Sequence, residues 1–206
     1  MSRLEVFHCE QGTPEWHECR LGIPTASCLA AVMAKGRKKG EPSLTRRTYM
    51  LKLIGERLTG EPSDSFSNKH TDRGHIDEPL ARVGYEAETG ELVEQVGFMR
   101  RGEFGYSPDG LINLDGLLEA KSKLPHLHLD CLLRDKVPSE HMQQIQGGLW
   151  VSEREWCDFT SYSRGCPQFI KRVYRDEIAI KAIAQAVAEF LEQMHELQQK
   201  IEVKAA

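Results

Sequence analysis

Two acidic residues and a lysine lie close together in the sequence with a spacing that suits metal-assisted chemistry. Between Asp109 and Lys121, two apolar arms flank Asn113-Leu-Asp-Gly116, which is typical turn sequence, so the segment is expected to form a β-hairpin. Folding the hairpin back brings Asp109 beside Glu119, or within a residue or two of it. Glu119 and Lys121 are two residues apart and therefore share one face of a strand. Two carboxylates and one amine are thus expected to converge at the edge of a sheet.

Carboxylates crowded in this way repel one another, and a hard divalent cation relieves the repulsion. Mg²⁺ prefers oxygen ligands and keeps several waters, so Asp109, Glu119 and a main-chain carbonyl are enough to hold one ion. A second ion nearby would let the pair clamp the attacking and leaving oxygens of a phosphodiester, while Lys121 orients water or steadies developing charge. The alternative is a solvent-facing hairpin whose Glu–Lys pair contributes under ~1 kcal/mol. The bare pattern arises by chance about once per 200 residues.

The overall charge gives no sign of a nucleic-acid-binding protein. With a net charge of −4, any contact with DNA has to be local. The cationic clusters are Lys35, Arg37, Lys38 and Lys39 followed by Arg46 and Arg47, and a smaller pair at Arg100 and Arg101. Judged from charge alone, a solvated loop and a phosphate-contacting role account equally well for the larger cluster.

The length and composition fit one domain of ordinary globular type. A chain of 206 residues is most simply a single α/β or α+β domain. No apolar run approaches the ~20 residues that cross a bilayer. The N-terminal Met1–Phe7 does not resemble a secretory signal, so we expect a cytoplasmic protein with no membrane partner. The six cysteines include no C-x-x-C pair, which favours reduced, mostly buried thiols over a zinc ribbon.

Periodicity and turn residues predict helices, then strands, then helices. Predicted helices run from Thr25 to about Met33, from Ser43 with Leu44, Leu51, Ile54 and Leu58 apolar, from Thr71 to Gly90, over 138–151 and over 176–204. Predicted strands, besides the hairpin, cover 91–99, 104–107, Trp156–Tyr162 and Phe169–Tyr174, and predicted loops cover 35–42 and 59–70. The sum is an α/β fold with a central mixed β-sheet flanked by helices.

The last predicted helix carries one continuous apolar stripe. Its members follow an alternating four-three spacing: Ile183, Val187, Phe190, Met194, Leu197 and Ile201. Packing of this helix on its own sheet is the favoured interpretation, and a contact with another subunit or partner is the alternative.

Several ordered segments resemble a known family, the lambda-exonuclease (YqaJ-type phage recombinase) branch of the PD-(D/E)xK nuclease superfamily. They are Gln11-Gly-Thr-Pro-Glu-Trp16, Arg20-Leu-Gly-Ile-Pro-Thr-Ala-Ser27, Gly74-x-x-x-Glu78-Pro-Leu-Ala-Arg82, Ser107-Pro-Asp-Gly110, Leu118-Glu-Ala-Lys121 and Gln144-Ile-Gln-Gly-Gly-Leu-Trp150. The resemblance implies a single nuclease domain over 1–206 with a restriction-endonuclease-like core. The motifs lie within about 11–175, and a C-terminal helix occupies about 176–204.

The resemblance also implies roles for the residues of the hairpin and its surroundings. Asp109 and Glu119 would be metal ligands together with the Ala120 carbonyl, and Lys121 would be the catalytic lysine. Glu78 would reach a second metal or its water, and Gln144 would help to position the nucleophilic water.

A second implied site binds the 5′-terminal phosphate through Arg20, Ser27 and Ser107. Arg20 offers a bidentate fork, and Thr25 and Ser27 lie at a predicted helix start, whose free N–H groups favour an anion. Plain helix capping is the alternative for Thr25 and Ser27.

The family has a further basic residue soon after its E-x-K strand. Here Lys123 or His126 is the candidate, and the sequence does not decide between them. The pair His126-x-His128 lacks a third ligand and is interpreted as a surface or DNA-facing feature rather than a metal site.

What the resemblance implies overall is a Mg²⁺-dependent 5′→3′ exonuclease, with two ions and with Mn²⁺ able to substitute. It would degrade one strand of linear double-stranded DNA to mononucleotides and leave 3′ overhangs for phage-type recombination. The resemblance further implies a homotrimer and a companion single-strand annealing protein. A restriction-like or structure-specific endonuclease is the nearest alternative. A non-catalytic DNA-end-binding protein is a second alternative, disfavoured because all of the implied catalytic residues are present.

Overall fold

The larger of two β-sheets has five strands in the order β2-β5-β6-β7-β8. In the computed structural model, which describes residues 3–36, 38, 41, 43–63 and 69–205, only β6 and β7 run parallel and the other neighbours are antiparallel. The strand bounds are Val93–Glu94 (β2), Gly110–Ile112 (β5), Gly116–Ser122 (β6), Trp156–Tyr162 (β7) and Phe169–Tyr174 (β8). The predicted central mixed sheet is therefore confirmed.

A smaller antiparallel sheet was not predicted. It consists of β1 (Leu4–Phe7), β3 (Phe98–Arg101) and β4 (Phe104–Tyr106), in the order β1-β3-β4. The predicted strand over 91–99 is accordingly wrong as one element, because its first part belongs to the large sheet and its last part to the small one. Gly97 lies at the crossing, where its N–H bonds to Phe7 O at 2.9 Å. A Cβ at Gly97 would collide with main-chain oxygen of Cys9, so the close approach requires glycine.

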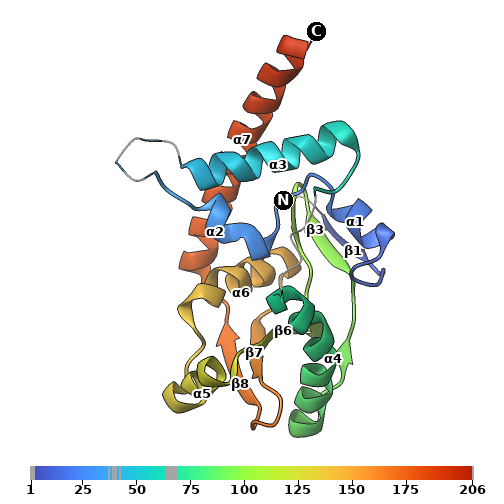
Figure 1. Cartoon of the computed structure of the whole chain (residues 1–206), viewed down its shortest axis with the longest axis vertical. Helices are drawn as coiled ribbons and strands as arrows, with labels where there is room; N and C mark the ends of the chain where they lie inside the picture. Colours follow the sequence, from blue (N-terminus) through green and yellow to red (C-terminus); the bar gives the residue numbers. More distant parts are fainter. Residues whose placement is uncertain (1–2, 37, 39–40, 42, 64–68, 206) are drawn as a thin grey trace.

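Helices cover both faces of the large sheet. The helix bounds are Pro14–Arg20 (α1), Leu29–Val32 (α2), Leu44–Thr59 (α3), Lys69–Thr89 (α4), Pro125–Arg134 (α5), Ser139–Ser152 (α6) and Glu177–Ala205 (α7). Tyr85 of α4 packs with Ile112 and Leu118, whereas the alternate strand residues Leu111 and Leu117 belong to the core that contains α6. Because neighbouring residues of a strand face opposite ways, α4 and α6 lie on opposite faces. Figure 1 shows α4, α6 and the strands between them.

The helix from Ser43 forms as predicted, but its buried face is a different one. The Ser43 hydroxyl accepts a hydrogen bond from Arg46 N at 3.2 Å, and Gly60 ends the helix with φ of 72°. Of the four predicted apolar positions only Ile54 is buried. Leu44, Leu51 and Leu58 are exposed, because Met50 and Leu53, with Ile54, form the stripe that joins the core.

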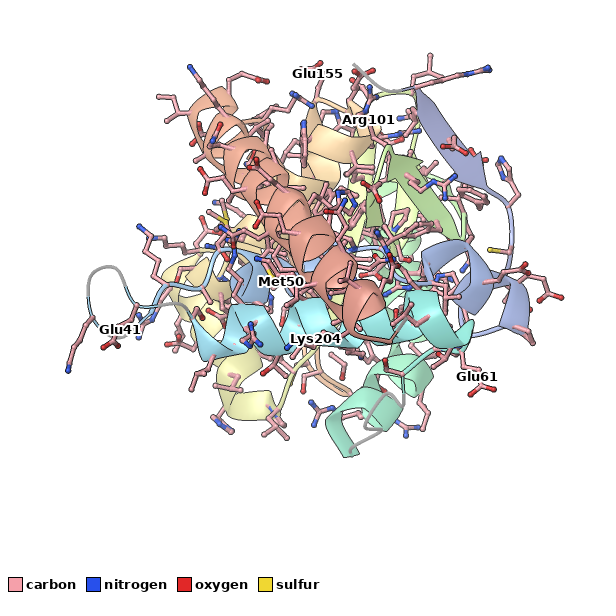
Figure 2. The ribbon with its side chains drawn as sticks, turned by 90° about the horizontal axis from the view of Figure 1, so that it is seen from above. Glu41, Met50, Glu61, Arg101, Glu155 and Lys204 are labelled. Carbon is pink, nitrogen blue, oxygen red and sulfur yellow. The ribbon has the colours of Figure 1, made fainter. Side chains whose placement is uncertain are left out.

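The predicted stripe of α7 packs on the chain's own core, as favoured. Ile183, Val187, Phe190 and Met194 are buried, and the more distal Leu197 and Ile201 are partly buried against the same core. The C-terminal end of α7 continues past α3, as Figures 1 and 2 show. Among the residues that the structure describes, no helix combines the length and the apolar character that crossing a bilayer requires.

Two expectations about chemically active side chains are wrong. His128 is not a surface residue: it is buried, with Nδ1 2.9 Å from Ser161 Oγ and Nε2 2.8 Å from Pro167 O. It faces inward because α5, which was not predicted, packs this side against β7 and β8. The six cysteines are free thiols as expected, but only Cys131 and Cys157 are buried.

Candidate active site

The hairpin that carries the two carboxylates forms as the sequence predicts. β5 and β6 pair with Gly110 opposite Leu118 and Ile112 opposite Gly116, which places Asp109 at the level of Glu119. Asn113 makes the turn with φ of 50°, a conformation that asparagine tolerates. Asp109 Oδ2 accepts a hydrogen bond from the main-chain N–H of Ala120 at 2.7 Å. This bond fixes the Asp109 carboxylate against β6, beside Glu119.

Glu119 is completely buried and is held by three side chains. Its Oε2 accepts a hydrogen bond from the Tyr106 hydroxyl at 2.9 Å. Its Oε1 accepts one from Gln144 Nε2 at 2.5 Å and also forms an ion pair with Lys121 Nζ. The structure thus brings Gln144, on α6, to the hairpin as expected. The sequence did not identify Tyr106 as a site residue, because a tyrosine in a short apolar strand is expected to belong to the core. Its position directly before Ser107-Pro-Asp109 is the signal that could have identified it.

The burial of this cluster changes its proton affinities. Burial, opposed by Lys121 and Tyr106 and reinforced by the charge of Asp109, raises the pKa of Glu119 to about 7. Burial also lowers the pKa of Lys121, but the charges of Glu119 and Asp109 outweigh it and leave that pKa above its ordinary value. Lys121 therefore remains an ammonium ion at neutral pH, and it is the counter-charge of the buried carboxylate.

The chemistry of the hairpin fits a hard divalent cation. Asp109 and Glu119 supply only oxygen ligands, and the raised pKa of Glu119 reflects its burial first and the charge of Asp109 after it, so a bound cation would favour the ionised carboxylate. Within the described ranges, no group of three or more histidine, cysteine, aspartate or glutamate side chains is arranged to hold a metal. A metal site here would therefore consist of these two carboxylates completed by water and by main-chain oxygen, for which Ala120, the residue after Glu119, is the candidate.

Glu78 approaches the hairpin through an arginine. On α4, Glu78 Oε1 forms an ion pair with Arg82 Nη2 at 2.7 Å, and Arg82 Nε donates to the main-chain oxygen of Asp109 at 3.3 Å. Glu78, Arg82 and Asp109 line one cavity of about 440 Å³, together with Trp16 and Gln11. Arg82 is the last residue of one of the motifs that resemble the family, but the sequence indicated no role for it.

The residues expected to bind a 5′-phosphate form two contacting pairs. Arg20 Nη1 donates to Ser107 Oγ at 2.6 Å, and the same hydroxyl accepts from Trp16 Nε1 at 3.0 Å. The Arg20 guanidinium stacks on Trp16, 4.0 Å from the ring centroid. Burial lowers the pKa of Arg20, and nearby groups including Cys28 and Tyr49 oppose this effect.

The second pair lies on the neighbouring turn. Thr25 Oγ1 is 3.1 Å from Ser27 Oγ, and Thr25 forms a β-bridge with Gly105 of β4, the strand that leads to Ser107. Thr25 begins a 3-10 turn, Ala26–Cys28, ahead of α2, and no hydrogen bond from its side chain caps that turn within the described structure. Simple capping therefore does not account for these two hydroxyls.

The two candidates for a further basic residue lie elsewhere. Lys123 Nζ is 3.0 Å from His141 Nε2 and 3.6 Å from Glu140 Oε1, both in the first turn of α6. Burial, and after it Lys123, lowers the pKa of His141 to about 4, so its neutral ring accepts from the ammonium group. His126 is exposed in the first turn of α5.

A mixed sheet with helices on both faces, carrying Asp109, Glu119 and Lys121 on one hairpin, defines a nuclease-type core. A family model described as the YqaJ-like viral recombinase domain matches residues 15–155. The chain belongs to this family.

Solved structures agree with this assignment. The alkaline exonuclease LHK-Exo from Laribacter hongkongensis, also solved in complex with dAMP, is 36% identical with a TM-score of 0.84, over 94% of this chain and 98% of that chain. A phage-related exonuclease from Haemophilus somnus 129PT is 17% identical with a TM-score of 0.67, over 87% and 96% of the two chains, which shows a shared fold. No curated protein matches the chain.

Proposed function

We propose that the protein is a Mg²⁺-dependent 5′→3′ exonuclease that degrades one strand of linear double-stranded DNA. It releases mononucleotides and leaves 3′ single-stranded overhangs for recombination. The observation that carries the proposal is the buried Glu119, held beside Asp109 and Lys121 on one hairpin. Family membership and the likeness to an alkaline exonuclease support a DNA exonuclease as the class of enzyme.

The chain's own residues would prepare the site for water and a phosphodiester. Bound Mg²⁺, with Mn²⁺ as a substitute, supplies positive charge against the phosphate oxygens and lowers the pKa of bound water. Asp109 and Glu119, with the Ala120 carbonyl, would hold a first ion, and Glu78 would serve a second. Lys121 and Gln144 meet at the same oxygen of Glu119, so both are placed to orient the attacking water and to stabilise charge on the phosphate.

Recognition of a 5′-phosphorylated end would rest on Arg20, Ser107, Thr25 and Ser27. Arg20 has donors beyond the one used on Ser107, and a guanidinium fork suits a phosphate. Ser107 is two residues from Asp109, so a phosphate held at Ser107 lies close to the metal ligands. A fixed distance between the bound end and the cleaved bond yields one nucleotide per cut. The complex of LHK-Exo with dAMP supports a mononucleotide product.

Assembly and partners are further parts of the proposal. The family resemblance supports a homotrimer around duplex DNA and a companion single-strand annealing protein.

The function is tested with end-labelled linear duplex carrying 5′-phosphates, followed over time with Mg²⁺ and with EDTA. Mononucleotide release from the 5′ end in Mg²⁺ alone, abolished in Asp109→Ala, is the expected result. Identical traces for the wild type and Asp109→Ala would remove the proposal. Closed circular duplex is the control, because an enzyme that needs an end leaves it intact whereas an endonuclease of the same superfamily opens it.

A further inference from the structure

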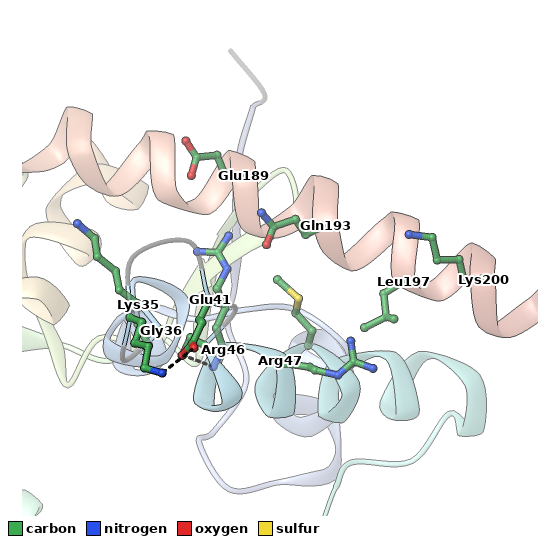
Figure 3. A pocket seen from close by; sticks show the side chains of 13 residues that line it. Lys35, Gly36, Glu41, Arg46, Arg47, Glu189, Gln193, Leu197 and Lys200 are labelled. Atoms are coloured by element: carbon green, nitrogen blue, oxygen red, sulfur yellow. Dashed lines mark hydrogen bonds and ion pairs between the residues drawn. The ribbon is translucent and has the colours of Figure 1, made fainter.

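A second cavity lies between α3 and α7. Its volume is about 760 Å³. Four of the cations that line it are Lys35, Arg46 and Arg47, which the sequence singled out, and Lys200 from α7. Figure 3 shows Arg46 rising from α3 toward Glu189 and Gln193 on α7, while Arg47 extends along α3 below Leu197. The basic cluster of the sequence is therefore completed by a residue more than 150 positions away, and we refer to these four residues as the α3–α7 basic pocket.

Arg46 has an unused hydrogen-bonding face in this pocket. Its Nη1 donates to Val32 O at 2.5 Å, which anchors the guanidinium to the end of α2. Its Nε and Nη2 are buried and make no hydrogen bond within the described structure. Buried polar atoms without a partner destabilise a fold, more so when the group is charged, so this arrangement requires an explanation.

Nε and Nη2 are the two nitrogens that form the side-on fork of a guanidinium. In two other arginines of the chain a carboxylate fills this fork. Arg172 donates through Nε and Nη2 to both oxygens of Asp158 at 2.8 Å, and Arg100 uses the same pair on Glu5. Two oxygens of an anion are what such a fork binds best. Arg46 thus has the geometry of an anion receptor.

The charges around the pocket favour an anion over a metal or a cation. Glu41 and Glu189 also line it, but Glu41 is paired with Lys38 at 3.9 Å. Glu189 faces the Arg46 guanidinium, whose lowered pKa follows mainly from burial with Glu189 in opposition. Lys200 is paired with Glu196 at 3.8 Å. Lys35, Arg46 and Arg47 still outnumber Glu189, the lining acid that remains to neutralise them. The fork is closed to solvent in this conformation, so neighbouring side chains must rearrange before a phosphate oxygen reaches it.

The position of the pocket relates it to the end-binding residues. Tyr49, adjacent in α3 to Met50 of the pocket, places its hydroxyl 3.3 Å from the N–H of Thr25. The Tyr49 ring also packs on Phe190, whose ring lies 5.3 Å from the Arg46 guanidinium carbon. The pocket and the Thr25–Ser27 turn are thus joined through α2 and α3.

We propose that the α3–α7 basic pocket binds a backbone phosphate of the duplex beyond the cleaved end. This inference rests on the proposed action on DNA ends. Arg46 holds two phosphate oxygens through its fork, and Lys35, Arg47 and Lys200 add long-range attraction. The pocket contributes affinity for duplex length and takes no part in hydrolysis.

The test measures duplex binding without cleavage, by fluorescence anisotropy in EDTA over a series of salt concentrations. A long 5′-phosphorylated duplex is compared with one just long enough to fill the hairpin site. Arg46→Gln and the rim variant Lys35→Gln/Lys200→Gln remove charge, and Arg46→Lys keeps charge without the fork. Arg134→Gln, on exposed α5, is the matched control for removal of one surface arginine charge.

The proposal expects weaker binding of the long duplex by Arg46→Gln. The slope of log affinity against log salt should become shallower by about 0.9 for each phosphate that the variant no longer neutralises. Arg46→Lys should restore part of the affinity, the rim variant should weaken binding without loss of folding, and Arg134→Gln should match the wild type. Every variant should cleave the short duplex in Mg²⁺ at the wild-type rate. If the wild-type protein does not cleave the short duplex, that result counts against the proposed nuclease function and not against the pocket.

Inorganic phosphate and a mononucleotide, tested as additives, separate a free phosphate ligand from DNA backbone. Either additive could raise the melting temperature of the wild type but not of Arg46→Gln. If this happens while Arg46→Gln binds the long duplex as the wild type does, the pocket binds free phosphate and the DNA assignment is overturned. Wild-type affinity for the long duplex in both Arg46→Gln and the rim variant would do the same. If Arg46→Gln does not fold and the rim variant binds the long duplex with wild-type affinity, Arg46 serves only to pack α3 against its neighbours and the proposal fails.

Discussion

The Tyr106 hydroxyl donates a 2.9 Å hydrogen bond to Oε2 of Glu119, on the side of the carboxylate opposite to Lys121 and Gln144. Tyr106 is itself buried, and burial, with the nearby charge of Glu119, raises its pKa well above the ordinary value. The hydroxyl is therefore a permanent donor. It stabilises the ionised form of a carboxylate that burial would otherwise protonate near neutral pH.

Replacing Tyr106 by phenylalanine removes this donor and leaves the ring. Because a hydrogen bond to the charged form lowers a carboxyl pKa, its removal raises the pKa of Glu119. The acid limb of the pH–rate profile should move to higher pH, with activity near neutral pH reduced about tenfold and recovered at alkaline pH. Tyr174→Phe, at an exposed position of β8, is the control. An unshifted profile with a uniformly reduced rate would contradict this role.

Lys121→Ala should abolish turnover while most of the DNA affinity survives. The ammonium group is the counter-charge of Glu119, and a group that stabilises developing charge typically contributes about 10²–10³ in rate. Single-turnover cleavage and anisotropy on the same duplex separate the two effects. Lys171→Ala, a partly exposed lysine on β8 paired with Asp135, controls for removal of positive charge. Retained cleavage in Lys121→Ala would mean that the lysine is misassigned.

Removing the 5′-phosphate of the substrate should slow initiation markedly. Arg20 and Ser107 are in contact at 2.6 Å, and a 5′-hydroxyl end offers the guanidinium no charge. Ser107→Ala should reduce the preference for phosphorylated ends rather than the rate on unphosphorylated ones. Initial rates on matched duplexes differing only in the 5′ group provide the measurement. Equal rates on both ends would discredit the pocket.

The sequence was sufficient for the hairpin because its information is local. A turn between two apolar arms fixes the register, and the register alone places Asp109 beside Glu119. The cap of α3 is local in the same way, because the Ser43 hydroxyl accepts its hydrogen bond from the main-chain N–H of Arg46, three residues later. The family resemblance, rather than spacing, put Gln144 and Glu78 near the hairpin. The single-domain division remains a prediction.

What the sequence could not reveal depends on contacts between distant segments. The small sheet pairs Leu4–Phe7 with Phe98–Arg101, and no local sequence pattern predicts a pairing between segments so far apart. The burial of Met50 in place of Leu51 depends on which face of α3 meets α7. Lys200 and Arg46 share a pocket only because two helices cross. Tertiary packing decided each of these.

The contribution of Glu119 to the stability of the metal-free protein should fall as pH rises from about 4.5 to 7, whereas that of His141, whose pKa is lowered to about 4, rises over most of the same range. Glu119 has a folded-state pKa of about 7 against an ordinary value of 4.5, so over this range the folded state holds a proton that the unfolded state has released. A raised carboxyl pKa therefore stabilises the fold at low pH, and this contribution decreases at up to about 1.4 kcal/mol per pH unit. Denaturant unfolding in EDTA across the range gives the slope. Glu119→Gln, which cannot ionise, should remove the falling contribution, so that its stability rises more steeply with pH than that of the wild type, and Mg²⁺ should offset the loss in the wild type by favouring the carboxylate. Parallel pH dependences for the wild type and Glu119→Gln would show that Glu119 is ionised throughout and that Lys121 outweighs its burial.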